Sequence, residues 1–113
     1  MKIISLDRNK LLEDLRDSVQ RLQLEHPEVL EVRLFGSLAR GDYTGTSDVD
    51  LLVVLQRAED MDPVRRVMTF LPYFDLPCSV DLIVYTRAEL ERGLPGNAFL
   101  QQAWAESQLL SPG

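Results

Sequence analysis

Hydrophobic residues recur along the chain at two different spacings, which together predict a mixture of helices and strands. Over residues 8–25, leucines and a valine return every three or four positions with charged residues between them, the pattern of an amphipathic helix. Three later segments, 29–35, 49–55 and 79–85, are short and rich in Val and Leu, which is typical of buried strands.

Capping signals predict where the remaining helices begin. Asp62 followed by Pro63 indicates an N-cap and a first helical residue, with the helix reaching about residue 71. Thr86 with Glu89 forms a capping box for a short helix to residue 92. Asn97 is expected to cap a last helix over 98–106.

Two shorter elements complete the predicted order. A helical turn is expected at 38–40, and an edge strand at 109–110. We therefore expect a single domain over residues 1–113, an α/β (α+β) fold in two or three layers. Its core would be a small mixed sheet of three to four strands flanked by helices.

Composition and charge narrow the class of protein. The chain is 45% hydrophobic and 27% charged, as in soluble globular domains. It contains no apolar run of about 18 residues and no secretory signal pattern at its start. With a single cysteine, Cys78, it cannot form an internal disulfide, so we expect a cytoplasmic protein. The net charge of −6 disfavours binding to long nucleic acids, but Mg²⁺ can bring a single nucleotide to an acidic pocket.

Two aspartates interrupt the second apolar strand. Asp48 and Asp50 are two residues apart, so their side chains point to one face, with Cα atoms about 6.6 Å apart. Carboxylates are costly in an apolar strand unless a partner satisfies them. A divalent cation would satisfy both, and Mg²⁺ commonly binds one or two carboxylates together with substrate phosphates.

A third aspartate, Asp81, lies within the next apolar strand. If the two strands are neighbours, three carboxylates converge, which suits two metal ions about 3.5–4 Å apart that clamp a phosphoryl displacement. Asp81 would then help to hold a metal and could take the proton from the attacking hydroxyl.

A glycine-serine pair ends the first strand. Gly36 would let the backbone approach a phosphate closely, and the Ser37 hydroxyl can donate a hydrogen bond to it. Arg40, one turn further on, is placed to stabilise a leaving pyrophosphate, although a surface ion pair is an equally good role for it. Ser47, before Asp48, is a candidate nucleotide ligand or a residue that caps the loop.

These motifs together resemble a known family. The segments at 35–42 and 47–53, Phe-Gly-Ser-Leu-Ala-Arg-Gly-Asp and Ser-Asp-Val-Asp-Leu-Leu-Val, are similar to the minimal nucleotidyltransferases of the DNA polymerase β-like superfamily. The resemblance implies that Gly36 and Ser37 hold the triphosphate of ATP. It also implies that Asp48 and Asp50 bind two Mg²⁺ ions, or Mn²⁺, and that Asp81 completes the triad.

The resemblance further implies a protein partner. Minimal nucleotidyltransferases commonly pair with HEPN-domain toxins in hetero-oligomers, and some inactivate the toxin by attaching AMP to a tyrosine. Because 113 residues leave no room for a domain that binds a small acceptor, we expect the acceptor to come from another protein. The alternative is an antitoxin that only masks its toxin.

Plainer roles for the same residues stand beside these predictions. The three aspartates could be solvated carboxylates on edge strands, although their apolar neighbours disfavour an exposed edge. Arg65 and Arg66 are expected on a solvated helix face. Glycosyltransferases also use Asp-x-Asp but are far larger, and haloacid-dehalogenase phosphatases have a threonine where this chain has Leu51.

Overall fold

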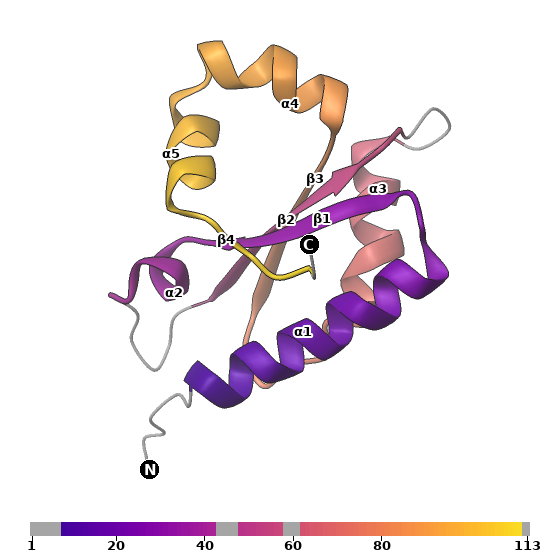
Figure 1. Cartoon of the computed structure of the whole chain (residues 1–113), viewed down its shortest axis with the longest axis vertical. Coiled ribbons are helices and arrows are strands. Elements are labelled where there is room, and N and C mark those ends of the chain that lie inside the picture. The colour runs from indigo at the N-terminus through magenta and orange to yellow at the C-terminus, as the bar shows by residue number, and fades with distance from the viewer. Residues whose placement is uncertain (1–7, 43–47, 58–61, 112–113) are drawn as a thin grey trace.

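The structure, a computed structural model, describes residues 8–42, 48–57 and 62–111. In these residues four strands form one mixed sheet in the order β3-β2-β1-β4 (Figure 1). The strands are β1 (Val29–Phe35), β2 (Val49–Leu55), β3 (Val80–Thr86) and β4 (Gln108–Leu109). β2 runs parallel to β3, and β1 is antiparallel to both β2 and β4. The predicted mixed sheet is confirmed, with β3 starting one residue later and β4 one residue earlier than expected.

Five helices flank the sheet in the described part of the chain, and their caps are the predicted ones. The Asp62 side chain accepts a hydrogen bond from the Arg65 amide, and Thr86 and Glu89 form the complete capping box. Asn97 accepts from the Leu100 amide. The helices are α1 (Arg8–Glu25), α2 (Ser37–Arg40), α3 (Pro63–Phe70), α4 (Arg87–Gly93) and α5 (Ala98–Glu106), with 3-10 turns at Leu71–Tyr73 and Leu94–Gly96. Among the described helices, none is long and apolar enough to cross a membrane.

The helices cover both faces of the sheet, so the domain has three layers (Figure 1). α1 and α3 pack on one face, where the odd-numbered residues of β2 from Val49 to Leu55 are buried. α4 and α5 cover the other face, over Leu52 and Val54. β2 is therefore buried on both sides, and Asp50 is the only residue of this strand that is not fully buried.

The edge position of β3 corrects one of our expectations. Its apolar residues were expected to exclude an exposed edge, yet β3 is the last strand of the sheet. Leu82 and Val84 are buried and Val80, Ile83 and Tyr85 half-buried, because α3 packs on one face of the strand and α4 contacts the other. Asp81 is exposed at this edge.

The expectation that Arg66 is solvated is wrong. Arg66 is buried, and its guanidinium forms two hydrogen bonds with the Glu89 carboxylate, Nη1 to Oε1 at 2.6 Å and Nη2 to Oε2 at 3.2 Å. Nη1 also donates to the backbone oxygen of Val84 at 3.4 Å. The pair thus ties α3 to β3 and α4 around the sheet edge.

Replacing Glu89 should measurably destabilise the fold. Arg66 holds the pKa of the Glu89 carboxyl below its ordinary value of 4.5. A carboxyl with a lowered folded-state pKa stabilises the fold above its unfolded pKa and loses that effect as the pH falls. We expect Glu89→Gln to cost about 1–2 kcal/mol at pH 7, less than for a fully buried pair because the Glu89 side chain is partly exposed.

Urea unfolding at several pH values checks this prediction. The difference between wild type and Glu89→Gln should be constant above about pH 5 and shrink below about pH 4. Asp14→Asn, which breaks the exposed Lys10–Asp14 pair, is the matched control and should change stability little. A Glu89→Gln effect as small as that of the control would contradict the assignment.

Candidate active site

The strand register brings two of the three predicted carboxylates together. Asp50 on β2 lies opposite Phe35 on β1 and opposite Asp81 on β3, so the three form one row across the sheet. Side chains alternate along a strand, so Asp50 points to the face that buries Leu52. The strand of Asp81 is thus the neighbour of the strand of Asp50, as convergence of their carboxylates requires.

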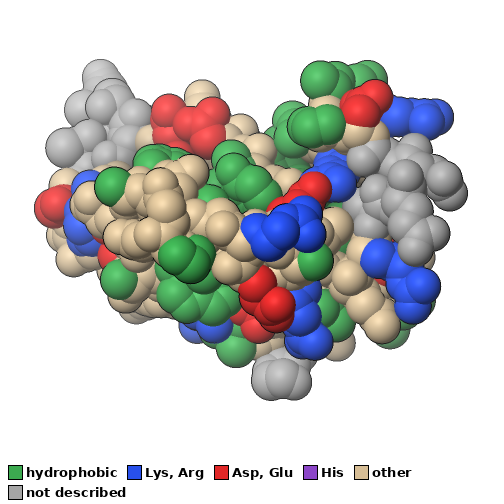
Figure 2. Space-filling model, turned by 90° about the horizontal axis from the view of Figure 1, so that it is seen from above, with side chains coloured by type: hydrophobic (Ala, Val, Ile, Leu, Met, Phe, Trp, Pro, Cys, Tyr) green, Lys and Arg blue, Asp and Glu red, His purple; other side chains and the backbone are tan. Residues whose placement is uncertain are grey.

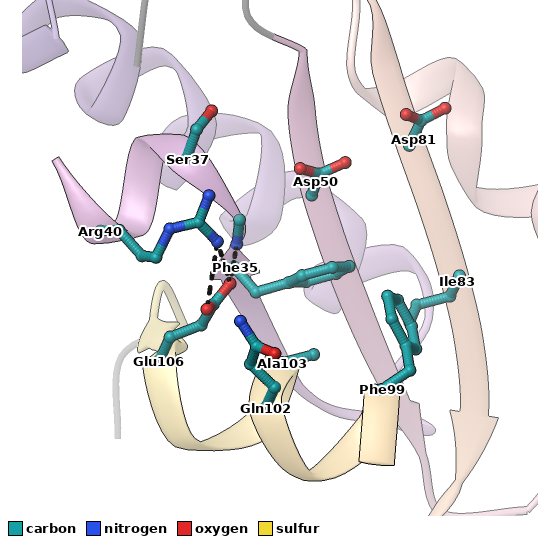
Figure 3. A pocket seen from close by; sticks show the side chains of 11 residues that line it. Phe35, Ser37, Arg40, Asp50, Asp81, Ile83, Phe99, Gln102, Ala103 and Glu106 are labelled. Carbon is teal, nitrogen blue, oxygen red and sulfur yellow. Dashed lines mark hydrogen bonds and ion pairs between the residues drawn. The ribbon is translucent and has the colours of Figure 1, made fainter. Parts of the chain in front are cut away.

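The row forms the floor of a pocket with a volume of about 560 Å³ (Figure 3). Its lining comes from the ends of β1 and β2, from β3, from α2 and from α5. A volume of this size is typical of small-molecule sites. The lining residues are Phe35, Gly36, Ser37, Arg40, Asp50, Asp81, Ile83, Phe99, Gln102, Ala103 and Glu106.

Gly36 allows the turn after β1 to lie directly against Asp50. Its φ of +80° is in the left-handed region, and a Cβ added there would stand 2.1 Å from Asp50 Oδ2. Any side chain would therefore displace either the turn or the carboxylate. The close approach expected at Gly36 was to a phosphate and stays a prediction; in this structure the group next to its backbone is the Asp50 carboxylate.

Asp50 is in an unfavourable environment for a negative charge. Its pKa is raised above the ordinary value of 3.8, first because it is partly buried and then because Asp81 and Asp48 are nearby. Asp48 itself is exposed and does not line the pocket. Asp81 and Asp48 thus both disfavour a negative charge on Asp50, although of these three carboxylates only Asp50 and Asp81 line the pocket.

The donor set suits a magnesium ion held by few protein ligands. Within the described ranges, no group of three or more acidic, histidine or cysteine side chains is arranged to hold a metal ion. Mg²⁺ usually takes one or two carboxylates and completes its shell with water and substrate phosphates. Asp50 and Asp81 can supply such a pair, and a cation there would relieve the repulsion that raises the pKa of Asp50.

The sequence analysis missed Glu106, which organises one side of the pocket. Its Oε2 accepts a hydrogen bond of 2.6 Å from the Gly36 amide and lies 3.0 Å from Arg40 Nη1 (Figure 3). Arg40 Nε also donates to Asp42 Oδ2 at 3.1 Å. Arg40 therefore forms the ion pairs of one of its two predicted roles. It also lines the pocket, where its contact with a phosphate stays a prediction. Nothing in the sequence near Glu106 signals this contact, because the residue is 70 positions away from Gly36.

The other residues of α5 in the pocket were also missed. Phe99, Gln102 and Ala103 form the wall that faces the carboxylates (Figure 3). Phe99 and Phe35 meet edge to face, with ring centroids 6.0 Å apart. Ser47, predicted as a nucleotide ligand, lies outside the described residues.

Comparison with known proteins identifies the class to which this site belongs. Residues 12–109 match the family model of the nucleotidyltransferase domain, so the chain belongs to the nucleotidyltransferase family. A Sulfolobus solfataricus protein described as a nucleotidyltransferase is 32% identical, with 75% of each chain covered and a TM-score of 0.65. A toxin–antitoxin structure solved with AMP-PNP is 22% identical over 93% of this chain and 73% of the other, with a TM-score of 0.50. No curated protein matches.

These matches confirm the predicted family and fold. The family model spans both the Gly36-Ser37 turn and the three aspartates. Members of this family typically use a nucleoside triphosphate and a divalent metal, which agrees with the acidic pocket described above.

Substitution of Gly36 tests the close contact with Asp50. Gly36→Ala should destabilise the fold by about 1–3 kcal/mol and displace Asp50, abolishing Mg²⁺-dependent binding of ATP. Gly41→Ala is the matched control, because Gly41 also has a positive φ, +89°, but no atom of the described residues lies within 4 Å of its added Cβ.

Thermal unfolding and ATP titration with and without Mg²⁺ separate the two effects. Gly41→Ala should lose stability by about 1 kcal/mol from backbone strain and keep its ATP affinity. Unchanged ATP affinity in Gly36→Ala would show that the turn and Asp50 do not form one site.

Proposed function

We propose that the protein transfers AMP from ATP to a tyrosine hydroxyl of a partner protein and acts as the antitoxin of a HEPN toxin. The observation that carries the proposal is the pocket in which the Gly36-Ser37 turn faces Asp50 and Asp81. A phosphate-binding turn and a carboxylate pair are the two parts that transfer of a nucleotide requires.

The proposed reaction is an in-line displacement at the α-phosphorus of ATP. The acceptor oxygen forms a bond to this phosphorus while the bond to the bridging oxygen of the β-phosphate breaks, and pyrophosphate leaves. Asp81 takes the proton of the acceptor hydroxyl. Asp50 and Asp81, the carboxylates that line the pocket, would hold Mg²⁺, which would neutralise charge on the phosphates. Asp48 stays a proposed third ligand although it does not line the pocket, and we propose two ions, with Mn²⁺ as a substitute for Mg²⁺.

The residues of α2 would hold the leaving group. Ser37 Oγ can donate to a phosphate oxygen, and Arg40 can stabilise the pyrophosphate if it exchanges its bond to Glu106 for a phosphate. We also propose Ser47 as a nucleotide ligand. ATP is the donor to test first, because the toxin–antitoxin protein of the same fold was solved with AMP-PNP.

The partner is proposed from the motif resemblance. The segment around Gly36 and Asp48 resembles minimal nucleotidyltransferases, which pair with HEPN-domain toxins. The similarity to a chain from a toxin–antitoxin structure concerns the fold and is compatible with such a pair. We propose a hetero-oligomer in the cytoplasm, where ATP and Mg²⁺ are available, with no direct binding to long nucleic acids or membranes.

The direct test is transfer of radioactive AMP from α-labelled ATP to the partner protein that co-purifies with this chain. We expect Mg²⁺-dependent labelling of one tyrosine, and loss of at least about a thousandfold in rate for the Asp48→Ala/Asp50→Ala variant. Asp14→Ala is the control, because it removes an exposed carboxylate from α1, on the other face of the sheet, and should keep the labelling rate. Full neutralisation of the toxin by the double variant, without labelling, would instead support an antitoxin that works by masking.

Glu106 should oppose nucleotide binding. Its carboxylate accepts hydrogen bonds from the Gly36 amide and Arg40, two donors that a phosphate would use. The negative charge of Glu106 would also repel the phosphate. Glu106→Gln keeps the shape of the side chain but gives up the charge-assisted bonds, so the Kd for ATP should fall about fivefold to tenfold.

Isothermal titration with ATP and Mg²⁺ measures this change. Glu91→Gln removes the same charge from an exposed position on α4 and should leave the Kd unchanged within about twofold. Weaker binding by Glu106→Gln would mean that Glu106 holds Arg40 in place for the nucleotide.

A further inference from the structure

We propose that Phe99, with Phe35 and Ile83, forms the acceptor subsite and selects an acceptor whose hydroxyl is carried on an aromatic ring. We call these three residues, two aromatic and one aliphatic, the aromatic corner. The inference rests on the proposed transfer to a hydroxyl and adds the residues that choose the acceptor.

The groups that line the pocket follow an order from the β1 side to the β3 side. Gly36, Ser37 and Arg40 lie on the β1 side, Asp50 lies in the middle, and Asp81 lies on the β3 side (Figure 3). Neighbouring strands are about 4.8 Å apart, so this order spans roughly 10 Å from β1 to β3. Ile83 is on the same strand and face as Asp81, and Phe99 extends toward it from α5 (Figure 3).

The geometry of the proposed reaction fixes the side from which the acceptor arrives. In an in-line displacement the attacking oxygen and the leaving oxygen are on opposite sides of the phosphorus. If the α2 side receives the pyrophosphate, the acceptor must arrive from the Asp81 side. The acceptor oxygen then forms its bond to the α-phosphorus beside Asp81, which takes the proton, and the rest of the acceptor extends over Ile83 and Phe99.

The side of the pocket where the acceptor would arrive carries an exposed aromatic ring, that of Phe99. Phe99 is 59% exposed, although it is a large hydrophobic residue, and it lines the same pocket as Asp50 and Asp81. Of the exposed large hydrophobic residues in the described part of the chain, Phe99 alone lines the pocket. Aromatic rings favour edge-to-face or offset contacts with other rings, and Phe99 already makes one such contact with Phe35. A second ring, from the acceptor, would bury the exposed surface of Phe99.

Figure 2 shows one face of the molecule, on which groups of hydrophobic side chains lie among Lys, Arg, Asp and Glu side chains. Exposure of a hydrophobic side chain alone therefore does not mark a binding site. Phe99 is distinguished by being exposed and lining the pocket at the same time.

The test uses the full chain and two small probes, N-acetyl-L-tyrosinamide and N-acetyl-L-serinamide. Each is titrated with Mg²⁺ and AMP-PNP present, while the Ile83 methyl signal is followed by NMR. We expect the tyrosine probe to shift this signal saturably and the serine probe to leave it unchanged. Phe99→Ala should weaken binding of the tyrosine probe about fivefold or more, and Phe99→Trp should restore it.

Met68→Ala is the matched control, because Met68 is a similarly exposed hydrophobic residue on α3, in the other helical layer. It should leave the tyrosine probe's affinity unchanged, and thermal unfolding should show that all variants fold. Equal shifts with the two probes, or no shift with either, would overturn the proposal.

ATP affinity distinguishes an acceptor subsite from a binding site for the nucleotide base. Phe99→Ala should keep the Kd for ATP and Mg²⁺ within about twofold of wild type. A large rise in that Kd would mean that the aromatic corner holds the base, which would also overturn the proposal. If the wild type binds the tyrosine probe but no ATP, the proposed transfer fails while the ring-binding subsite stands.

Discussion

The contact between the backbone at Gly36 and the Asp50 carboxylate determines how the rest of the site can be arranged. A Cβ at Gly36 would come within 2.1 Å of Asp50 Oδ2, so the turn after β1 and the carboxylate on β2 share a space that has no room for a side chain. The antiparallel pairing that sets Phe35 opposite Asp50 brings them together. From this contact follow the position of α2 and the placement of Ser37 and Arg40 beside the carboxylates.

The charges around this contact are unevenly balanced. Among the described residues that line the pocket, Asp50, Asp81 and Glu106 face a single cation, Arg40, which is shared between Glu106 and Asp42. β2 has apolar cover on both faces, so burial and neighbouring carboxylates together raise the pKa of Asp50. These lining groups by themselves leave the pocket negatively charged. A divalent cation bound together with a nucleotide, as proposed, would offset this charge.

Much of the fold follows from the sequence because its signals are local. Strand patterns and the caps at Asp62, Thr86 and Asn97 depend on neighbouring residues, and all were correctly predicted. The two-residue spacing predicted that Asp48 and Asp50 share one face, but Asp48 precedes β2, is exposed and does not line the pocket. Contacts made by helix side chains over long sequence separations could not be predicted. Glu106 and Arg66 look like ordinary surface charges until tertiary packing places Glu106 at Gly36 and Arg66 at Glu89.

The floor of the pocket and the wall formed by α5 are held by different parts of the fold. The floor, with Asp50 and Asp81, is set by backbone hydrogen bonds between β2 and β3, and a shift of one residue would turn Asp81 to the opposite face. The wall formed by α5 is separate from that ladder, and its side chains face the floor without being part of it. Substitutions at Phe99, Gln102 or Ala103 would therefore reshape this wall while strand pairing keeps the spacing of Asp50 and Asp81. With the acceptor subsite proposed above, such a protein could change its target while keeping its chemical step.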